Sequence, residues 1–213
     1  MKKATTRQHQ HDQLGFSLLE LIITISLVSI LAAFAIPNLQ SYIMNSRING
    51  ASQQLIQTFQ TARNEATKRQ RNVVVCLADS TPTCTMGNKP SGWIVFEDAN
   101  ANWLFDSTET LISVRNFNAT KLSVLADGSN RVSYNATGFA AIGNGANPQI
   151  RSTGMVICDR RGNVDSNGGP GEQSVARGLI IAGTGRVSLT KLRSNTTPPG
   201  IEQLLTATGS SCS

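Results

Sequence analysis

Histidine is almost absent from this sequence, and the two that occur lie close to its start. His9 and His11 are the only histidines in 213 residues, so the chain has none after residue 11. A Ser-His-Asp or Cys-His catalytic arrangement needs a histidine as its base, and a histidine-ligated zinc site needs one as a ligand. These two kinds of site are therefore excluded from the rest of the chain.

Motifs for other catalytic or cofactor chemistry are missing as well. The cysteines include no C-x-x-C pair that would offer an all-cysteine zinc site, and no Walker A phosphate loop occurs. The stretch GTGRVS at residues 183–188 starts like a dinucleotide loop but lacks the third glycine and a following helix. Acidic residues are few and scattered. We predict that the protein is not an enzyme and uses no cofactor.

One long hydrophobic run lies near the start of the chain. Residues 16–36 form a stretch of 21 residues in which Glu20 is the only charged side chain. About 20 apolar residues suffice for a helix to span a bilayer core, so a transmembrane helix is predicted. A lone acid in such a segment costs roughly 2.5–3.5 kcal/mol on insertion scales, so Glu20 should have a function and a partner. The leader before the run is basic, which predicts that it stays in the cytoplasm.

The residues around this run resemble the N-terminus of type IV prepilins and pseudopilins. A basic leader precedes GFSLLE at residues 15–20, and the apolar run ends at Pro37. The resemblance implies that a prepilin peptidase cleaves between Gly15 and Phe16 and that the new Phe16 amine is methylated. It also implies that Glu20 pairs with the N-terminal amine of a neighbouring subunit, which would offset the desolvation of both charges. From physics alone, a plain signal anchor is an alternative that leaves Glu20 unexplained.

Helical periodicity continues beyond the apolar run. Between residues 48 and 66 apolar side chains recur every three or four positions, with polar side chains on the other face. These residues are Ile48, Ala51, Leu55, Phe59, Ala62 and Ala66. We expect the stripe to pack beneath a folded domain. The predicted organisation is a leader at 1–15, a transmembrane and filament-core helix at 16–37, an amphipathic helical half at 38–71 and a β-rich domain at 72–213.

After residue 71 the pattern becomes short and β-like. Nine segments are rich in branched or aromatic residues and are bounded by Gly, Asn, Pro or Ser. They are NVVVCLA, GWIVFE, TLISVR, KLSVLA, RVSYNA, GFAAIG, GMVICD, RGLIIAG and GRVSLTK. No second long helix and no internal repeat stand out. The predicted fold class is α+β and type IV pilin-like, with a long N-terminal helix packed against a C-terminal antiparallel β-sheet domain.

The four cysteines suit an oxidising compartment such as the periplasm. Cys76 and Cys84 are close enough in the sequence to close a small loop, whereas Cys158 and Cys212 could tie down the C-terminal tail. Four cysteines allow three connectivities, and the sequence does not choose among them. The favoured hypothesis pairs Cys76 with Cys84 and Cys158 with Cys212.

Residues 98–109, DANANWLFDSTE, have the spacing of a calcium-binding loop. Oxygen-bearing side chains stand at loop positions 1, 3, 5, 9 and 12, with a backbone carbonyl at position 7. They are Asp98, Asn100, Asn102, Asp106 and Glu109, with Leu104 supplying the carbonyl. Position 6 is Trp103 where the sharp turn needs glycine, and the flanking segments look like strands instead of helices. Because Asp and Asn are also ordinary turn residues, a plain hairpin loop is favoured and no metal is predicted.

The C-terminal half of the chain is basic. From residue 115 onward there are ten Lys or Arg and five Asp or Glu. Six of these basic residues lie in the last 60 positions: Arg160, Arg161, Arg177, Arg186, Lys191 and Arg193. Such a cluster can neutralise phosphates and bind DNA in a salt-sensitive way, or it can be an ordinary solvated face. On charge alone the solvated face is favoured.

The whole chain resembles the FimT/GspH family of minor pilins and pseudopilins. The stretches that carry the resemblance are GWIVFEDANANWLFDSTETLISV in the middle and CDRRG…ARGLIIAGTGRVSLTK near the end. In FimT-like minor pilins a Gly-Arg-x-Arg motif is associated with DNA capture during natural transformation. Here Gly185 and Arg186 match that motif, and Ser188 replaces its second arginine.

Three functions follow from the resemblance. The first is a minor type IV pilin that primes or builds the pilus, with double-stranded DNA as an additional ligand of the basic C-terminal region. The second is a GspH-like pseudopilin of a type II secretion system, which binds other pseudopilins and cargo. The third is a structural subunit without a ligand. In each, the partners are other pilins and the prepilin peptidase. We expect a single-pass inner-membrane protein with a periplasmic domain, which then enters a pilus or pseudopilus.

Overall fold

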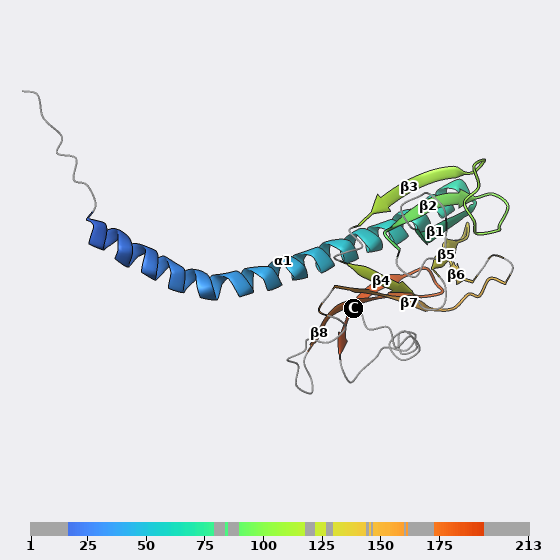
Figure 1. Cartoon of the computed structure of the whole chain (residues 1–213). Helices are drawn as coiled ribbons and strands as arrows, with labels where there is room; N and C mark the ends of the chain where they lie inside the picture. Colours follow the sequence, from blue (N-terminus) through green and yellow to red (C-terminus); the bar gives the residue numbers. More distant parts are fainter. Residues whose placement is uncertain are drawn as a thin grey trace, which may run out of the picture. The chain divides into compact units, whose positions relative to one another are not determined.

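The computed structural model describes residues 17–78, 84, 90–117, 122–126, 130–143, 145, 147–159, 161 and 173–193. These residues form one helix followed by nine strands, and Figure 1 shows the course of the chain through them. The elements are α1 (Leu18–Arg69), β1 (Asn72–Ala78), β2 (Gly92–Asp98), β3 (Thr110–Asn116), β4 (Ser123–Ala126), β5 (Arg131–Tyr134), β6 (Ala140–Ile142), β7 (Thr153–Cys158), β8 (Gln173–Ile181) and β9 (Val187–Arg193). Each predicted strand segment overlaps one of these strands.

The chain divides into two compact units between Ile43 and Met44, and the first contains only helix in its described part. Helix α1 begins after Ser17, whose hydroxyl accepts a hydrogen bond from the Leu19 amide at 3.3 Å, as an N-cap does. This unit includes a segment long and apolar enough to cross a membrane, and none of its most apolar 18-residue window is buried. Its large hydrophobic side chains therefore need another apolar surface to shield them from water.

The second unit holds the rest of α1 and the nine strands. The predicted apolar stripe of α1 is buried, with Ile48, Leu55 and Phe59 completely enclosed. The helix ends where Gln70 adopts a left-handed conformation, with φ of 54°, and donates from its side chain to the Thr67 carbonyl at 2.6 Å. This reversal carries the chain directly from α1 into β1.

The strands form two antiparallel sheets. One has the order β3-β2-β1-β5-β6 and the other has the order β4-β7-β8-β9. A single hydrophobic core joins the stripe of α1 to residues from both sheets, including Trp93 of β2 and Ile157 of β7. The ring of Phe59 meets that of Tyr134 edge-on, with centroids 6.4 Å apart. The predicted α+β fold, a long helix packed on antiparallel sheets, is confirmed.

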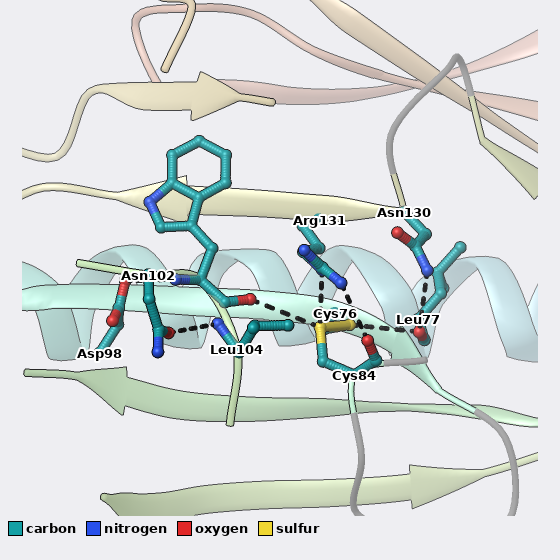
Figure 2. The surroundings of a disulfide bond; sticks show 9 residues. Cys76, Leu77, Cys84, Asp98, Asn102, Leu104, Asn130 and Arg131 are labelled. Atoms are coloured by element: carbon teal, nitrogen blue, oxygen red, sulfur yellow. Dashed lines mark hydrogen bonds between the residues drawn. A yellow bond between two sulfur atoms is a disulfide. The ribbon is translucent and has the colours of Figure 1, made fainter. Parts of the chain in front are cut away.

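A disulfide closes the far end of β1. Cys76 and Cys84 are bonded, with Cα atoms 5.7 Å apart, so this predicted pairing is confirmed. Figure 2 shows Arg131 donating from Nε to the Cys84 sulfur at 3.1 Å and from Nη2 to the Cys84 carbonyl at 3.0 Å. Cys158 is also disulfide-bonded. Its predicted partner Cys212 lies outside the described residues, so that pairing stays a prediction.

An open groove of about 700 Å³ runs between α1 and the edge strand β3. Its lining is mostly polar and comprises Gln54, Gln57, Thr58, Thr61, Val95, Ile112, Ser113, Val114, Arg115 and Asn116. None of these side chains is a carboxylate, a histidine or a cysteine. The groove therefore offers no residue pair for general acid–base or nucleophilic catalysis.

Candidate functional site

Glu20 lies in the first turn of α1, in the unit that contains only helix. A carboxylate there is favoured by the positive end of the helix dipole. Glu20 and its neighbours Leu19 and Leu21 are exposed, so the charge stands on an apolar surface that nothing in this unit covers. The predicted cleavage and methylation site, Gly15 and Phe16, lies outside the described residues. The roles of these three residues remain predictions.

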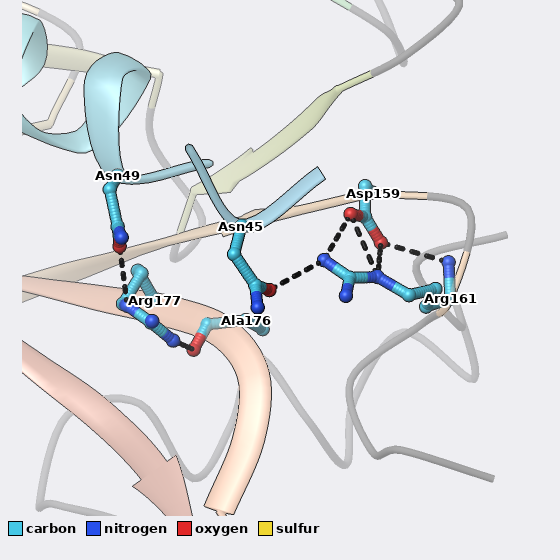
Figure 3. A network of polar contacts seen from close by, with 6 residues as sticks. All are labelled: Asn45, Asn49, Asp159, Arg161, Ala176 and Arg177. Carbon is cyan, nitrogen blue, oxygen red and sulfur yellow. Dashed lines mark hydrogen bonds and ion pairs between the residues drawn. The ribbon is translucent and has the colours of Figure 1, made fainter. Parts of the chain in front are cut away.

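The loop after β7 fixes Arg161 against a buried acid. Arg161 donates from Nε to both carboxylate oxygens of Asp159 at 3.0 Å and from Nη2 to Oδ2 at 2.7 Å. Asp159 itself is buried. Nη2 also donates to Asn45 Oδ1 of α1 at 3.0 Å, as Figure 3 shows. Through Nε and Nη2 this guanidinium binds the loop to the helix.

Arg177 of β8 makes a similar contact one helical turn further along α1. Its Nε donates to Asn49 Oδ1 at 3.2 Å, and its Nη1 donates to the Ala176 carbonyl at 3.3 Å (Figure 3). Partial burial lowers the pKa of Arg177 from its ordinary value, and the positive charge of Arg161 lowers it further. The two arginines thus attach the four-stranded sheet to consecutive turns of α1.

Arg186 has a different setting, in the turn between β8 and β9. It is exposed and lies immediately before β9. The turn is closed by hydrogen bonds from the Gly185 amide to the Ala182 carbonyl at 2.8 Å and from the Ala182 amide to the Arg186 carbonyl at 2.9 Å. Gly185 has a φ of +81°, a conformation that glycine adopts without strain. The motif glycine therefore shapes the turn that presents Arg186.

Arg63 of α1 holds this turn in place. Its Nε donates to the Gly138 carbonyl at 3.1 Å, and its Nη2 donates to the Thr184 carbonyl at 3.2 Å. Arg63 was not identifiable from the sequence, because its contacts are with residues 75 and 121 positions away. No local pattern distinguishes it from the other polar residues of the helix.

The predicted basic residues do not all form one patch. Arg161 and Arg177 contact Asn45 and Asn49, whereas the turn with Arg186 is held by Arg63. Asn49 and Arg63 are fourteen positions apart in α1, which corresponds to about 20 Å along the helix at 1.5 Å per residue. The two groups of arginine contacts are therefore separate. Arg160 and the side chains of Lys191 and Arg193 lie outside the described residues.

The Asp/Asn-rich loop between β2 and β3 is folded around its own side chains. Asn100 and Asn102 both donate from Nδ2 to Asp106 Oδ2, at 2.8 and 2.9 Å. Glu109 accepts from the Ala99 amide at 2.9 Å and from the Asp106 amide at 3.1 Å. The five side chains of the calcium-like spacing therefore belong to one compact loop. Among the described residues, no three His, Cys, Asp or Glu side chains already stand together as a metal site.

Asp98, the first residue of this loop, is 2% exposed. Its Oδ2 accepts from the Trp103 amide at 3.3 Å, whereas its Oδ1 is buried without a hydrogen-bond partner among the described residues. Burial raises the pKa of the Asp98 carboxyl, and the nearby charge of Glu109 adds to the rise, while hydrogen bonds from the Trp103, Asn102 and Ala101 amides oppose it in part. An acid in such a setting is costly to keep ionised.

Comparison with known proteins gives two family matches. The model of the type II transport protein GspH matches residues 51–185, which is more than half of the chain. The chain belongs to the GspH family. The model of the prokaryotic N-terminal methylation motif matches residues 10–36, a range that includes Gly15, Phe16 and Glu20. The predicted FimT/GspH membership is confirmed, and this GspH-family chain is a minor pilin or pseudopilin.

Two similar solved structures are crystal forms of the type IV minor pilin FimU from Pseudomonas aeruginosa (strain PAO1). The form in space group P21 is 18% identical, covers 73% of this chain and 95% of that chain, and gives a TM-score of 0.49. The form in space group P65 is 18% identical, covers 71% and 98%, and gives a TM-score of 0.46. No curated protein matches this GspH-family chain.

Proposed function

We propose that this GspH-family chain is a minor type IV pilin, a subunit that primes or builds the pilus. Residues 16–37 hold it in the inner membrane with its β-rich domain in the periplasm, until the helix is drawn into the filament. The observation that carries the proposal is the helix from residue 18 to residue 43, whose apolar side chains are exposed around Glu20, the one charged side chain in that range. Such a surface is stable in lipid or in a bundle of like helices.

Glu20 gives this assembly its register. In an apolar bundle an unpaired carboxylate is costly, but an amine brought beside it restores the balance of charge. After cleavage behind Gly15, the amine of Phe16 on a neighbouring subunit is such a partner. Only one stagger between two parallel helices brings the two charges together.

The test is to express Glu20→Ala in cells and follow its processing and its assembly separately. We expect the leader to be removed as in the wild type, seen as the same mobility on a gel, but the subunit to be strongly depleted from sheared filaments. Thr24→Ala is the matched control, because the Thr24 hydroxyl donates to the Leu21 carbonyl of its own helix at 2.8 Å. Incorporation of Glu20→Ala at the wild-type level would contradict the register role.

A pseudopilin of a type II secretion system is the second candidate, favoured by the description of the family whose model matches residues 51–185. Its partners would be other pseudopilins and cargo. Deleting the gene separates the two candidates, because a minor pilin is needed for surface pili and a pseudopilin is needed for secretion of exoproteins.

DNA capture is a further role for the pilin. It is supported by the exposed position of Arg186 on a turn fixed by Gly185 and Arg63. Because the backbone of this turn is already held in place, contact between Arg186 and a DNA phosphate costs only the conformational freedom of the Arg186 side chain.

A further inference from the structure

The loop at residues 98–109 adopts the backbone turn that its sequence argues against. In a calcium loop of this spacing, position 6 carries a glycine for the sharp turn. Here Trp103 occupies position 6 and nevertheless has a φ of 62°, in the left-handed region, and Ala101 has a φ of 59°. The turn is therefore made without the glycine.

Burial of the Trp103 side chain compensates for this conformation. Trp103 is 3% exposed and packs in a small hydrophobic cluster with Cys84, Ile94 and Phe96. An indole buries a large apolar area, which offsets the strain of a left-handed backbone. The Trp103 carbonyl oxygen lies 3.7 Å from the Cys84 sulfur. The centre of the loop is thereby fixed to the disulfide.

The side chains at positions 3, 5 and 9 already converge. The side-chain amides of Asn100 and Asn102 donate to the same oxygen of Asp106. Glu109, at position 12, accepts hydrogen bonds from the backbone amides of Ala99 and Asp106. Two N–H groups aimed at one carboxylate oxygen partly neutralise its charge, as a cation would do more completely. A half-turn of each asparagine amide presents its oxygen in place of its nitrogen, and it gives up the hydrogen bonds that these oxygens accept from the Asn102 and Leu104 amides.

An independent observation points to a missing positive charge. Asp98 Oδ1 is buried and accepts no hydrogen bond from any described residue, while Oδ2 accepts from the Trp103 amide within the loop. Asp98 is therefore a buried carboxylate with one oxygen that accepts no hydrogen bond from the described part of the chain, and the backbone amides of Trp103, Asn102 and Ala101 offset its charge only in part. Buried polar atoms in native proteins almost always have a partner, which can be an ion. Residues 98–109 contain three carboxylates and no Lys or Arg.

We propose that this loop binds one calcium ion through oxygen atoms at the six predicted positions. The ligands are the side chains of Asp98, Asn100, Asn102, Asp106 and Glu109 and the backbone carbonyl of Leu104. Hard oxygen ligands in a flexible arrangement of six or more suit calcium, whereas magnesium demands a tighter octahedron. The carboxylates are not gathered into a finished metal site in the described residues, so binding draws them inward and replaces the amide contacts of Asp106.

The test uses the full-length protein in detergent micelles, stripped with a chelator and titrated with calcium chloride. Tryptophan fluorescence reports on the site, since Trp103 lies in the loop and Trp93 is the only other tryptophan. We expect a saturable signal with Kd on the order of 10⁻⁴–10⁻³ M, as in extracellular modules, and a calcium-dependent rise in Tm. Magnesium at the same concentration should give less than about a tenth of the occupancy.

Two variants and one control decide the assignment. Glu109→Gln and Asp106→Asn should each weaken calcium binding by about tenfold or more, because each removes a ligand charge. Glu65→Gln should leave the Kd unchanged, because Glu65 pairs with Arg69 on α1, outside the loop. If Asp106→Asn misfolds, calorimetric titration of Glu109→Gln still tests the site, because glutamine keeps a polar side chain of the same size. Absence of any calcium-dependent change in the wild type, or equal affinity in the wild type and Glu109→Gln, would overturn the proposal.

Discussion

Gly185 lies against the carbonyl oxygen of Gly138, so closely that a β-carbon on Gly185 would collide with that oxygen. One glycine belongs to the β8–β9 turn and the other to the turn between β5 and β6, so the contact joins the two sheets. Arg63 donates to the Gly138 carbonyl and to Thr184 next to Gly185, and thereby adds the helix to the same junction. The amide of Ala140 donates to the Gly183 carbonyl at 2.9 Å beside it.

Replacing Gly185 by alanine should destabilise the domain. The new methyl group meets the Gly138 carbonyl, and a φ of +81° is strained for alanine, so we expect a loss of about 1–3 kcal/mol. Gly50→Ala is the control, since Gly50 lies in α1 with nothing within 4 Å of a new β-carbon. It should gain about 0.5–1 kcal/mol. Thermal unfolding of both variants checks the pair, and equal Tm values would contradict the packing described.

Arg186→Ala and Arg161→Ala should separate DNA binding from stability. In a salt series with double-stranded DNA, we expect Arg186→Ala to bind more weakly, to reduce the log–log slope by about one unit and to keep its Tm. Arg161→Ala should instead lose stability, by about 1–3 kcal/mol, because Asp159 is left buried without its partner. Failure of the wild type to bind DNA at low salt would end the DNA proposal and leave the assembly role standing.

Thr58→Val should destabilise the core. The indole nitrogen of Trp93 donates to Thr58 Oγ1 at 2.9 Å, and both residues are buried. Valine keeps the shape but removes the acceptor, so the orphaned N–H should cost about 1–3 kcal/mol in denaturant unfolding. Thr67→Val serves as the control, because the exposed Thr67 hydroxyl donates only to the Arg63 carbonyl of its own helix. An equal effect of both substitutions would argue against the Trp93 bond.

Tyr134 should make the domain sensitive to alkali. Burial raises the pKa of its phenol far above the ordinary value, and the charge of Arg63 opposes this only in part. Below a pH of about 10 the phenol is neutral in both the folded and the unfolded chain. Above it, the unfolded chain loses the proton while the folded chain keeps it, so this contribution to stability is present at lower pH and lost as the pH rises.

Tyr134→Phe should therefore unfold less readily at high pH than the wild type. At neutral pH it should be equally stable or about 1 kcal/mol more stable, since the Tyr134 hydroxyl is buried without a partner among the described residues. Tyr42→Phe is the control, because Tyr42 is exposed. Parallel stability curves for Tyr134→Phe and the wild type between pH 9 and 11 would count against the assignment.

The helix and the strands were predictable from sequence because their signals are local. The spacing of Ile48, Leu55 and Phe59 gives the buried stripe directly, and β1 coincides with the run NVVVCLA. The segment GFAAIG was predicted less well, since only Ala140–Ile142 pairs as β6. Phe139, next to it, is exposed beside a turn that is held by distant residues.

The site was predicted less completely, because its geometry depends on contacts distant in sequence. The sequence indicates a free positive charge at Arg161, whereas in the structure its guanidinium donates to Asp159 and Asn45. Trp103 argued against a sharp turn because a glycine is expected at its position. The turn forms nevertheless, since the left-handed backbone of Trp103 is stabilised by a cluster that includes Cys84 from another loop. Pairing and burial of this kind cannot be inferred from charge counts or residue spacing.

The order in which the strands enter the two sheets determines how the domain can be divided. The chain builds β1 to β3 in one sheet, places β4 in the other, returns for β5 and β6, and then completes the second sheet with β7 to β9. No single cut in the chain therefore yields two fragments that each hold a whole sheet. A C-terminal truncation that removes β7 leaves β4 without its pairing partner, so shortened forms should be lost to proteolysis instead of persisting as smaller folded domains.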